Sequence, residues 1–131
     1  MKNRTIRTLA VSAAAVTALG VTGVSPVSAK AGDIVQRGDC SARTDYQFKV
    51  QPRGSTFEFE FEVDSNRNGQ AWRVRIADNG TVIFKGTRRT VAPSGSFSVS
   101  GRTADLAGTD RFVARATNLA TGETCIARIS A

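Results

Sequence analysis

Apolar and polar residues alternate along most of the chain after residue 45, which is the pattern of β-strands with one buried face. The clearest run is residues 56–63, where apolar side chains fall on one face and glutamates on the other; the apolar set is Phe57, Phe59, Phe61 and Val63. Residues 71–77 alternate equally well and place Trp72, Val74 and Ile76 on a single face. These two runs predict a core built from strand faces rich in aromatic residues.

Turn residues separate these runs from several weaker ones. Asn79-Gly80 tolerates the positive φ angles of a short hairpin turn. The alternation predicts seven strands: residues 46–50, 56–63, 71–77, 81–86, 96–101, 111–117 and 123–130. No run after residue 30 has helical periodicity. Short alternating strands at this spacing indicate an all-β fold, a two-sheet antiparallel sandwich of about seven strands.

Two features of the predicted strands resemble immunoglobulin-like domains. Trp72 lies on the third predicted strand, and residues 105–118 are similar to the corner before the F strand and the F strand itself. Phe112 stands where that family has its corner tyrosine, and Ala114 where it has its F-strand cysteine. The resemblance covers residues 56–130 and implies an immunoglobulin-like or fibronectin-III-like sandwich. The chain is also similar to small secreted actinobacterial proteins of uncharacterised function, which implies export and no activity.

The first 29 residues have the pattern of a cleaved signal peptide. Lys2, Arg4 and Arg7 precede a charge-free run over residues 9–24, which is too short and too polar to span a bilayer comfortably. Small residues favour cleavage after Ala29 or Ala31. We therefore expect a leader at residues 1–29 and one secreted domain at residues 30–131, with no membrane attachment after cleavage.

The net charge and the two cysteines indicate what kind of exported protein this is. Removal of residues 1–29 takes away three basic residues and leaves a net charge of +4, which is below that of a dedicated nucleic-acid binder. No nucleic-acid partner is therefore expected. Cys40 and Cys125 have only each other as intramolecular partners, so an exported chain is expected to join them in a disulfide.

The chain contains no histidine, which removes the commonest general base and the Ser-His-Asp and Cys-His catalytic arrangements. Glu58, Glu60 and Glu62 offer carboxylates for acid–base work on a glycoside, but three glutamates on one strand are more typical of a solvated sheet face. No serine has a recognisable base beside it. We predict a protein that is not an enzyme and that uses no cofactor.

One loop has the oxygen spacing of a calcium site. Asp64, Asn66 and Asn68 occupy the first, third and fifth positions and Gly69 the sixth, but the twelfth position is Arg75 instead of glutamate. A turn rich in Asn and Gly accounts for the same residues without a metal. The sequence therefore leaves Ca²⁺ as a weak candidate and predicts no metal site.

The arginines carry the principal functional hypothesis. In an immunoglobulin-like strand order, four of them face outward on the same sheet: Arg73, Arg75, Arg115 and Arg128. Such a patch suits carboxylate, phosphate or sulfate groups, and Lys85, Arg88 and Arg89 are candidates to extend it. The alternative is that outward arginines only keep the protein soluble.

We therefore predict a binding module for an extracellular partner, either an anionic cell-wall polymer or a protein. The alternative is a secreted inhibitor or small effector that acts through a loop, residues 64–70 or 88–96. A hydrolase is a third, weaker hypothesis. Nothing in the sequence sets the oligomeric state.

Overall fold

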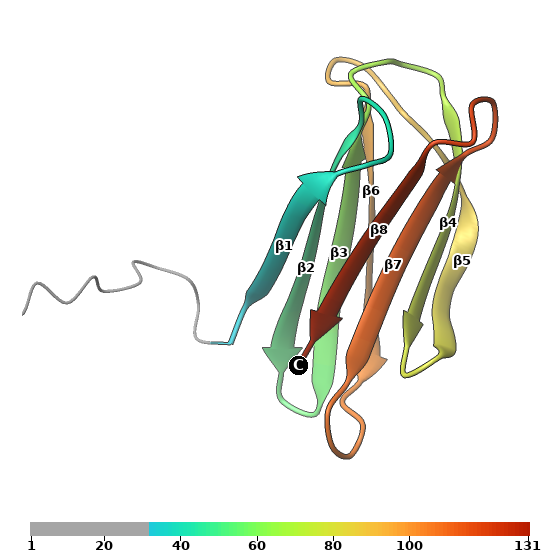
Figure 1. The fold of residues 1–131 in the computed structure, drawn as a ribbon. Coiled ribbons are helices and arrows are strands. Elements are labelled where there is room, and N and C mark those ends of the chain that lie inside the picture. The colour runs from blue at the N-terminus through green and yellow to red at the C-terminus, as the bar shows by residue number, and fades with distance from the viewer. Residues whose placement is uncertain (1–31) are drawn as a thin grey trace, which may run out of the picture.

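The computed structural model describes residues 32–131, and the predicted leader, residues 1–29, lies outside the described residues. The described part contains eight β-strands and no helix, hence no helix able to cross a membrane (Figure 1). The strands are β1 (Ile34–Asp39), β2 (Asp45–Arg53), β3 (Thr56–Asp64), β4 (Ala71–Asp78), β5 (Thr81–Arg89), β6 (Ser96–Ala104), β7 (Arg111–Asn118) and β8 (Thr124–Ser130).

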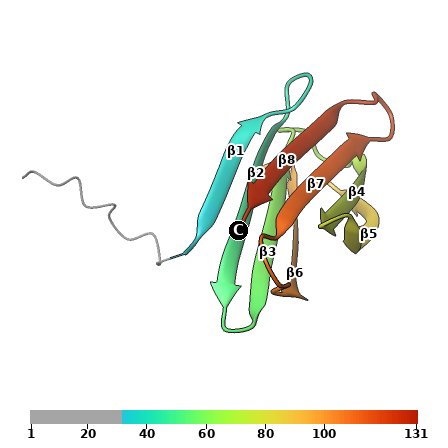
Figure 2. The same cartoon turned by 60° about the horizontal axis from the view of Figure 1, so that its bottom comes forward.

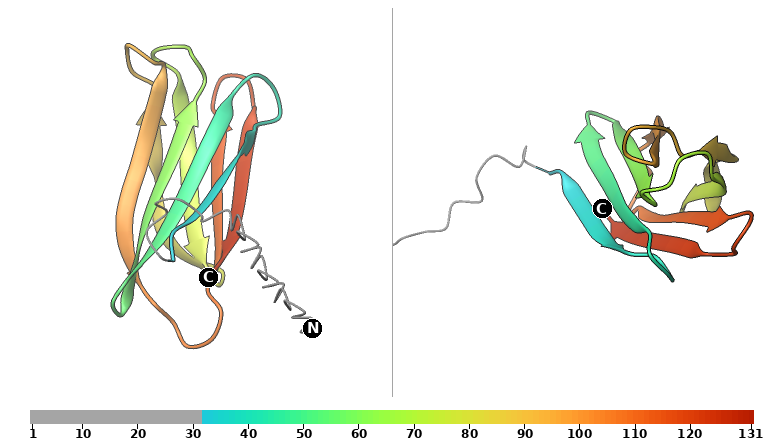
Figure 3. Two further views of the ribbon diagram at one scale, coloured as in Figure 1. Left: turned by 90° about the vertical axis from the view of Figure 1, so that its left-hand side faces the viewer. Right: turned by 90° about the horizontal axis from the view of Figure 1, so that it is seen from above.

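The strands form two antiparallel sheets of four strands, in the orders β1-β2-β3-β6 and β5-β4-β7-β8. Seen from above, the sheets form two layers (Figure 3). This confirms the predicted all-β sandwich, with eight strands instead of seven. The additional strand is β1, at the edge of the first sheet. Its pattern is weak because Val35 faces solvent and Gly38 interrupts the alternation.

The second sheet has the strand order of the C′-C-F-G sheet of immunoglobulin domains, with β4 in the C position and β7 in the F position. β3 and β6 are neighbours in the other sheet, as the B and E strands are in that layout. Trp72 lies on β4 and is fully buried. The strand arrangement that the resemblance implies is therefore present.

Aromatic side chains from both sheets fill the space between the layers. Phe57 on β3 contacts Phe112 on β7 edge-to-face, with ring centroids 5.4 Å apart. Trp72 on β4 lies 6.5 Å from Phe97 on β6, centroid to centroid. Phe48, whose direction the alternation leaves open, is also fully buried. These contacts across the layers fix which face of each strand is turned to solvent.

A single disulfide in the described part joins Cys40, just after β1, to Cys125 on β8, with Cα atoms 4.3 Å apart. It confirms the predicted pairing. The bond ties one sheet to the other along the side of the sandwich where β1 approaches β8. At the same side, Oε1 of Gln36 accepts a hydrogen bond from the backbone N–H of Arg128, 2.6 Å away. The first and last strands therefore hold the layers together.

Candidate binding surface

The arginines predicted to share a sheet face lie on the outer face of the second sheet. Arg73 and Arg75 are exposed on β4 because the residues that alternate with them are buried in the core. Arg115 on β7 and Arg128 on β8 are exposed for the same reason. Lys85 on β5 lies on this face as well, since it pairs with Arg75. We call these five side chains the cationic face: Arg73, Arg75, Lys85, Arg115 and Arg128.

The strand register places three of these cations side by side. Arg75 is paired with Lys85 on one side and with Arg115 on the other. Directly paired residues on neighbouring strands have their Cβ atoms about 4.5 to 5.5 Å apart. The row Lys85-Arg75-Arg115 therefore crosses three adjacent strands without an interruption. Sequence reasoning placed the arginines on one face but did not identify this row, because the row depends on the register of each strand pair.

The rest of this face offers no acidic partner. Arg73 is flanked by Thr87 and Thr117, and Arg128 is paired with Val113. Within residues 32–131, both ion pairs of the structure lie on the other sheet, so the cationic face has none. Like charges paired directly across strands destabilise a sheet by up to about 1 kcal/mol. The row therefore carries a repulsion that no acidic side chain of residues 32–131 offsets by an ion pair.

Two further basic residues belong to the surroundings of the cationic face but not to the row. Arg88 is paired with Trp72 and so has the opposite phase; its guanidinium carbon lies over the Phe84 ring, 4.9 Å from the centroid. Arg89 donates from Nη1 to the carbonyl oxygen of Gly69, 3.1 Å away. The suggested extension of the patch therefore fits Lys85 and Arg89, because Arg89 is paired with Ala71 and shares the phase of Lys85, but it does not fit Arg88.

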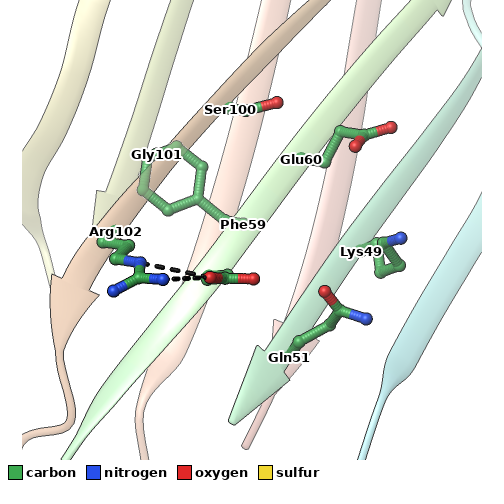
Figure 4. Close-up of a pocket in the computed structure, with 8 residues that line it drawn as sticks. Lys49, Gln51, Phe59, Glu60, Ser100, Gly101 and Arg102 are labelled. Carbon is green, nitrogen blue, oxygen red and sulfur yellow. Dashed lines mark hydrogen bonds and ion pairs between the residues drawn. The ribbon is translucent and has the colours of Figure 1, made fainter. Parts of the chain in front are cut away.

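The outer face of the first sheet carries the glutamate row of β3. Glu58 is engaged by Arg102 at 2.6 Å, along the dashed lines that start at Arg102 in Figure 4, and by Arg53 at 3.1 Å. These hydrogen bonds hold the pKa of the Glu58 carboxyl below the usual value. Glu60 lies between Lys49 and Ser100 in the register, at a shallow hollow of about 310 Å³. A general acid needs a raised pKa, so the shift at Glu58 is opposite to that chemistry.

The end of the same face carries a row of acids. Asp45 is paired with Asp39 on β1 and with Asp64 on β3. A hydrogen bond with Asp39, together with slight burial and the neighbouring charges, raises the pKa of Asp45. Among the described residues, no group of three or more acidic, histidine or cysteine side chains has a geometry that suits a metal ion.

The calcium candidate is a turn closed by its own hydrogen bonds. Oδ1 of Asp64 accepts the backbone N–H of Asn66 at 2.9 Å, and Asn66 adopts a left-handed φ of 56°. Asn68 precedes Gly69, whose N–H donates to the Thr90 carbonyl at 2.7 Å. These contacts account for the turn with Asp64, Asn66 and Asn68 in place and without a bound ion.

The two loops that were alternatives for an effector surface form one unit. The Thr90 hydroxyl donates to the Arg67 carbonyl and accepts the N–H of Gln70 at 2.9 Å. Gly95 has a φ of 69°, and a Cβ atom there would stand 2.3 Å from the backbone nitrogen of Arg67. Only glycine fits this approach, so residues 65–70 and 90–95 present a single, interlocked surface at one end of the sandwich.

The chain matches no protein-family model and no curated protein sequence. Among solved structures it has a likeness to chicken MD-1, whose crystal structure is of a complex with lipid IVa. The alignment covers 74% of this chain and 95% of that chain, with 10% identity and a TM-score of 0.31. None of these comparisons shows the resemblance to actinobacterial proteins. The candidate function therefore rests on the surface of this chain alone.

Proposed function

We propose that this domain is an exported, non-enzymatic binding module that holds an extracellular polyanion on its cationic face. The observation that carries the proposal is the row Lys85-Arg75-Arg115, in which three cations stand side by side with no acid on the same face. Arginine binds phosphate and carboxylate groups through paired hydrogen bonds, and lysine adds a point charge. Bound anions would remove the repulsion within the row.

The shape of the face favours a polymer over a small anion. Hollows of about 310, 400 and 230 Å³ lie elsewhere on the described part, and their linings include no residue of the cationic face. The cations themselves are exposed side chains on the outer face of a sheet. An extended polymer with repeated phosphate or carboxylate groups contacts several cations at once, which raises its affinity over that of a single group.

The same face lacks the features of a nucleic-acid site. Single strands bind through aromatic side chains on which bases stack, in addition to a basic groove. The outward residues between the cations are instead small or aliphatic: Thr87, Val113, Thr117, Thr124 and Ile126. An anionic glycopolymer without bases therefore fits the face better than a nucleic acid.

A second candidate function uses the interlocked loops. Residues 65–70 and 90–95 are held rigidly, and exposed apolar side chains lie at or near that end: Val91 at 58% and Leu119 at 47%. A rigid end with exposed apolar residues suits contact with another protein, as an inhibitor or effector would make. Exchange of these loops with the cationic face left intact separates the two functions.

The test compares a polymer with its monomer at equal phosphate concentration. Linear polyphosphate should bind the domain in isothermal titration calorimetry, whereas orthophosphate should give no measurable heat. With three contacts, the logarithm of the association constant should fall with the logarithm of salt concentration with a slope of about −2. Equal binding of monomer and polymer, or polymer binding that salt does not weaken, would argue against the proposal.

A further inference from the structure

Two aspartates are buried at the end of the sandwich where β4 ends and β7 begins, which Figure 2 brings forward. Asp78 is the last residue of β4 and is 1% exposed; Asp110 directly precedes β7 and is 0% exposed. Aspartate is almost never fully buried unless it is paired with a cation. Here the strand register brings the two buried residues together, because Asp78 is paired with Phe112, which lies two residues after Asp110.

Few donors face this pair. Neither carboxyl oxygen of Asp78 has a hydrogen-bond donor. Asp110 accepts only from the backbone N–H of Leu106, at a long 3.3 Å to each oxygen. A buried carboxylate without donors or a cation is costly, and two such carboxylates in contact cannot both ionise readily. One proton between the two carboxyls removes both penalties, because the protonated group then donates to its neighbour.

A third acidic side chain near the pair also disfavours ionisation of the two carboxyls. Asp105, in the same loop as Asp110, acts on both carboxyls. Ala131, which follows β8, exchanges backbone hydrogen bonds with Asp110. Arg111, the first residue of β7, has an exposed side chain. Phe112, which is paired with Asp78, packs against the Phe57 ring of β3. Burial, the hydrogen bond to Asp110 and these acidic charges raise the pKa of Asp78 to about 6.

We propose that Asp78 and Asp110 share one proton that latches the loop of residues 105–109 onto the end of β4, and that loss of this proton to solvent opens the loop. Little else holds the loop. Nδ2 of Asn79 donates to the Thr109 carbonyl at 3.3 Å, and the N–H of Asp105 donates to the Ser55 carbonyl at 2.9 Å. Repulsion between the two carboxylates therefore opens the loop before the sheets separate. This latch is independent of the cationic face.

The direction of the pH effect follows from the two states of Asp78. The unfolded carboxyl titrates near 3.8 and the folded one near 6, so the folded protein holds more protons between these values. The pair stabilises the folded protein fully below pH 3.8. This stabilisation falls as the pH rises from 3.8 to about 6, and it is lost above that pH. The difference between the folded and unfolded pKa of Asp78 corresponds to a rise of roughly a hundredfold in the unfolding equilibrium constant from low to high pH.

Carboxyl carbon NMR of the wild-type domain tests the shared proton without any substitution. The carboxyl of Asp78 should titrate near pH 6. Titration of Asp78 below about pH 4, the range of free aspartate, would overturn the proposal.

Hydrogen exchange tests the opening of the loop. Amides of residues 105–110, corrected for intrinsic rates, should exchange at least tenfold faster at pH 8 than at pH 5 in the wild type. Asp78→Asn supplies a permanent donor to Asp110, so this variant should lose the pH dependence. Ala107→Ser, an exposed change in the same loop that alters no carboxyl, should keep it.

A wild-type pH dependence that persists in Asp78→Asn would overturn the latch, as would a loop whose exchange does not change with pH. Asp110→Asn provides the same test from the other side of the pair, should Asp78→Asn not fold, because its amide oxygen still accepts from Leu106. The same loss of pH dependence is expected there.

Discussion

Replacement of both Cys40 and Cys125 by alanine should lower the free energy of unfolding by about 4 to 5 kcal/mol at 25 °C. The disulfide closes a loop with a sequence separation of 85 residues, which is most of the domain. A bond across so long a loop removes a large amount of conformational freedom from the unfolded chain. A single domain of this size has a total stability of about 5 to 15 kcal/mol, so the bond decides whether it stays folded.

Urea denaturation of the wild type and the double variant at neutral pH measures this effect. Reduction of the wild type with dithiothreitol is the matched control, because it opens the bond and leaves both side chains in place. Reduced wild type and double variant should have similar unfolding midpoints, both far below that of the oxidised wild type. A loss below about 1 kcal/mol would show that the other contacts between β1 and β8 suffice to join the sheets.

Reversal of two cations in the row, Arg75→Glu with Arg115→Glu, should weaken binding of linear polyphosphate by at least about 100-fold at low salt. Each cation makes charge-assisted hydrogen bonds of about 1.5 to 3 kcal/mol, and the new glutamates add repulsion to the ligand. Titration calorimetry of both proteins under identical buffer conditions gives the two affinities. The reversal exchanges one like-charge pair for another at exposed positions and leaves the buried residues of both strands unchanged, so the variant should remain folded.

The matched control makes the same change in net charge on the opposite sheet. Arg37→Glu with Lys49→Glu lies on the outer face of β1 and β2, among the acidic residues. This variant should retain polyphosphate affinity within about threefold, since only long-range attraction is reduced. Equal losses in both double variants would mean that net charge, and not the row, holds the polymer.

The strands and their buried faces were predictable because one face of each sheet is solvated and the other is not. A register shift of one residue would then move every apolar side chain of a strand from the core to the solvent. The alternation therefore determines which residues are buried. The edge strand β1 lacked this signal: Ile34 is only partly buried, and the strand continues through Gln36 and Gly38. Edge strands in general need less apolar surface than central ones, and their sequence pattern is correspondingly weaker.

The cationic row was only half predictable. Strand phase gives the face on which Arg75 and Arg115 lie, but pairing with Lys85 depends on the register of the β4–β5 hairpin. That register shifts at a bulge between Ile76 and Ala77, which the sequence does not mark.

The alternation pattern does indicate the buried acid pair. Asp110 lies two residues before Phe112 and Asp78 two residues after Ile76, so both continue the inward phase of their strands. An acid at an inward position is a departure from the pattern and marks a strained or functional site. The interlocking of residues 65–70 with Gly95 had no such signal, because it depends on how two distant loops meet.

The most direct test of the polyanion hypothesis is a ¹H–¹⁵N NMR titration of the oxidised domain with linear polyphosphate, which shows where the polymer lies. We predict that the largest shifts occur at amides of β4, β5 and β7 around Arg75, Lys85 and Arg115, and that they reverse on addition of salt. Shifts centred on the first sheet or on the interlocked loops, or no shifts at low salt, would contradict this account.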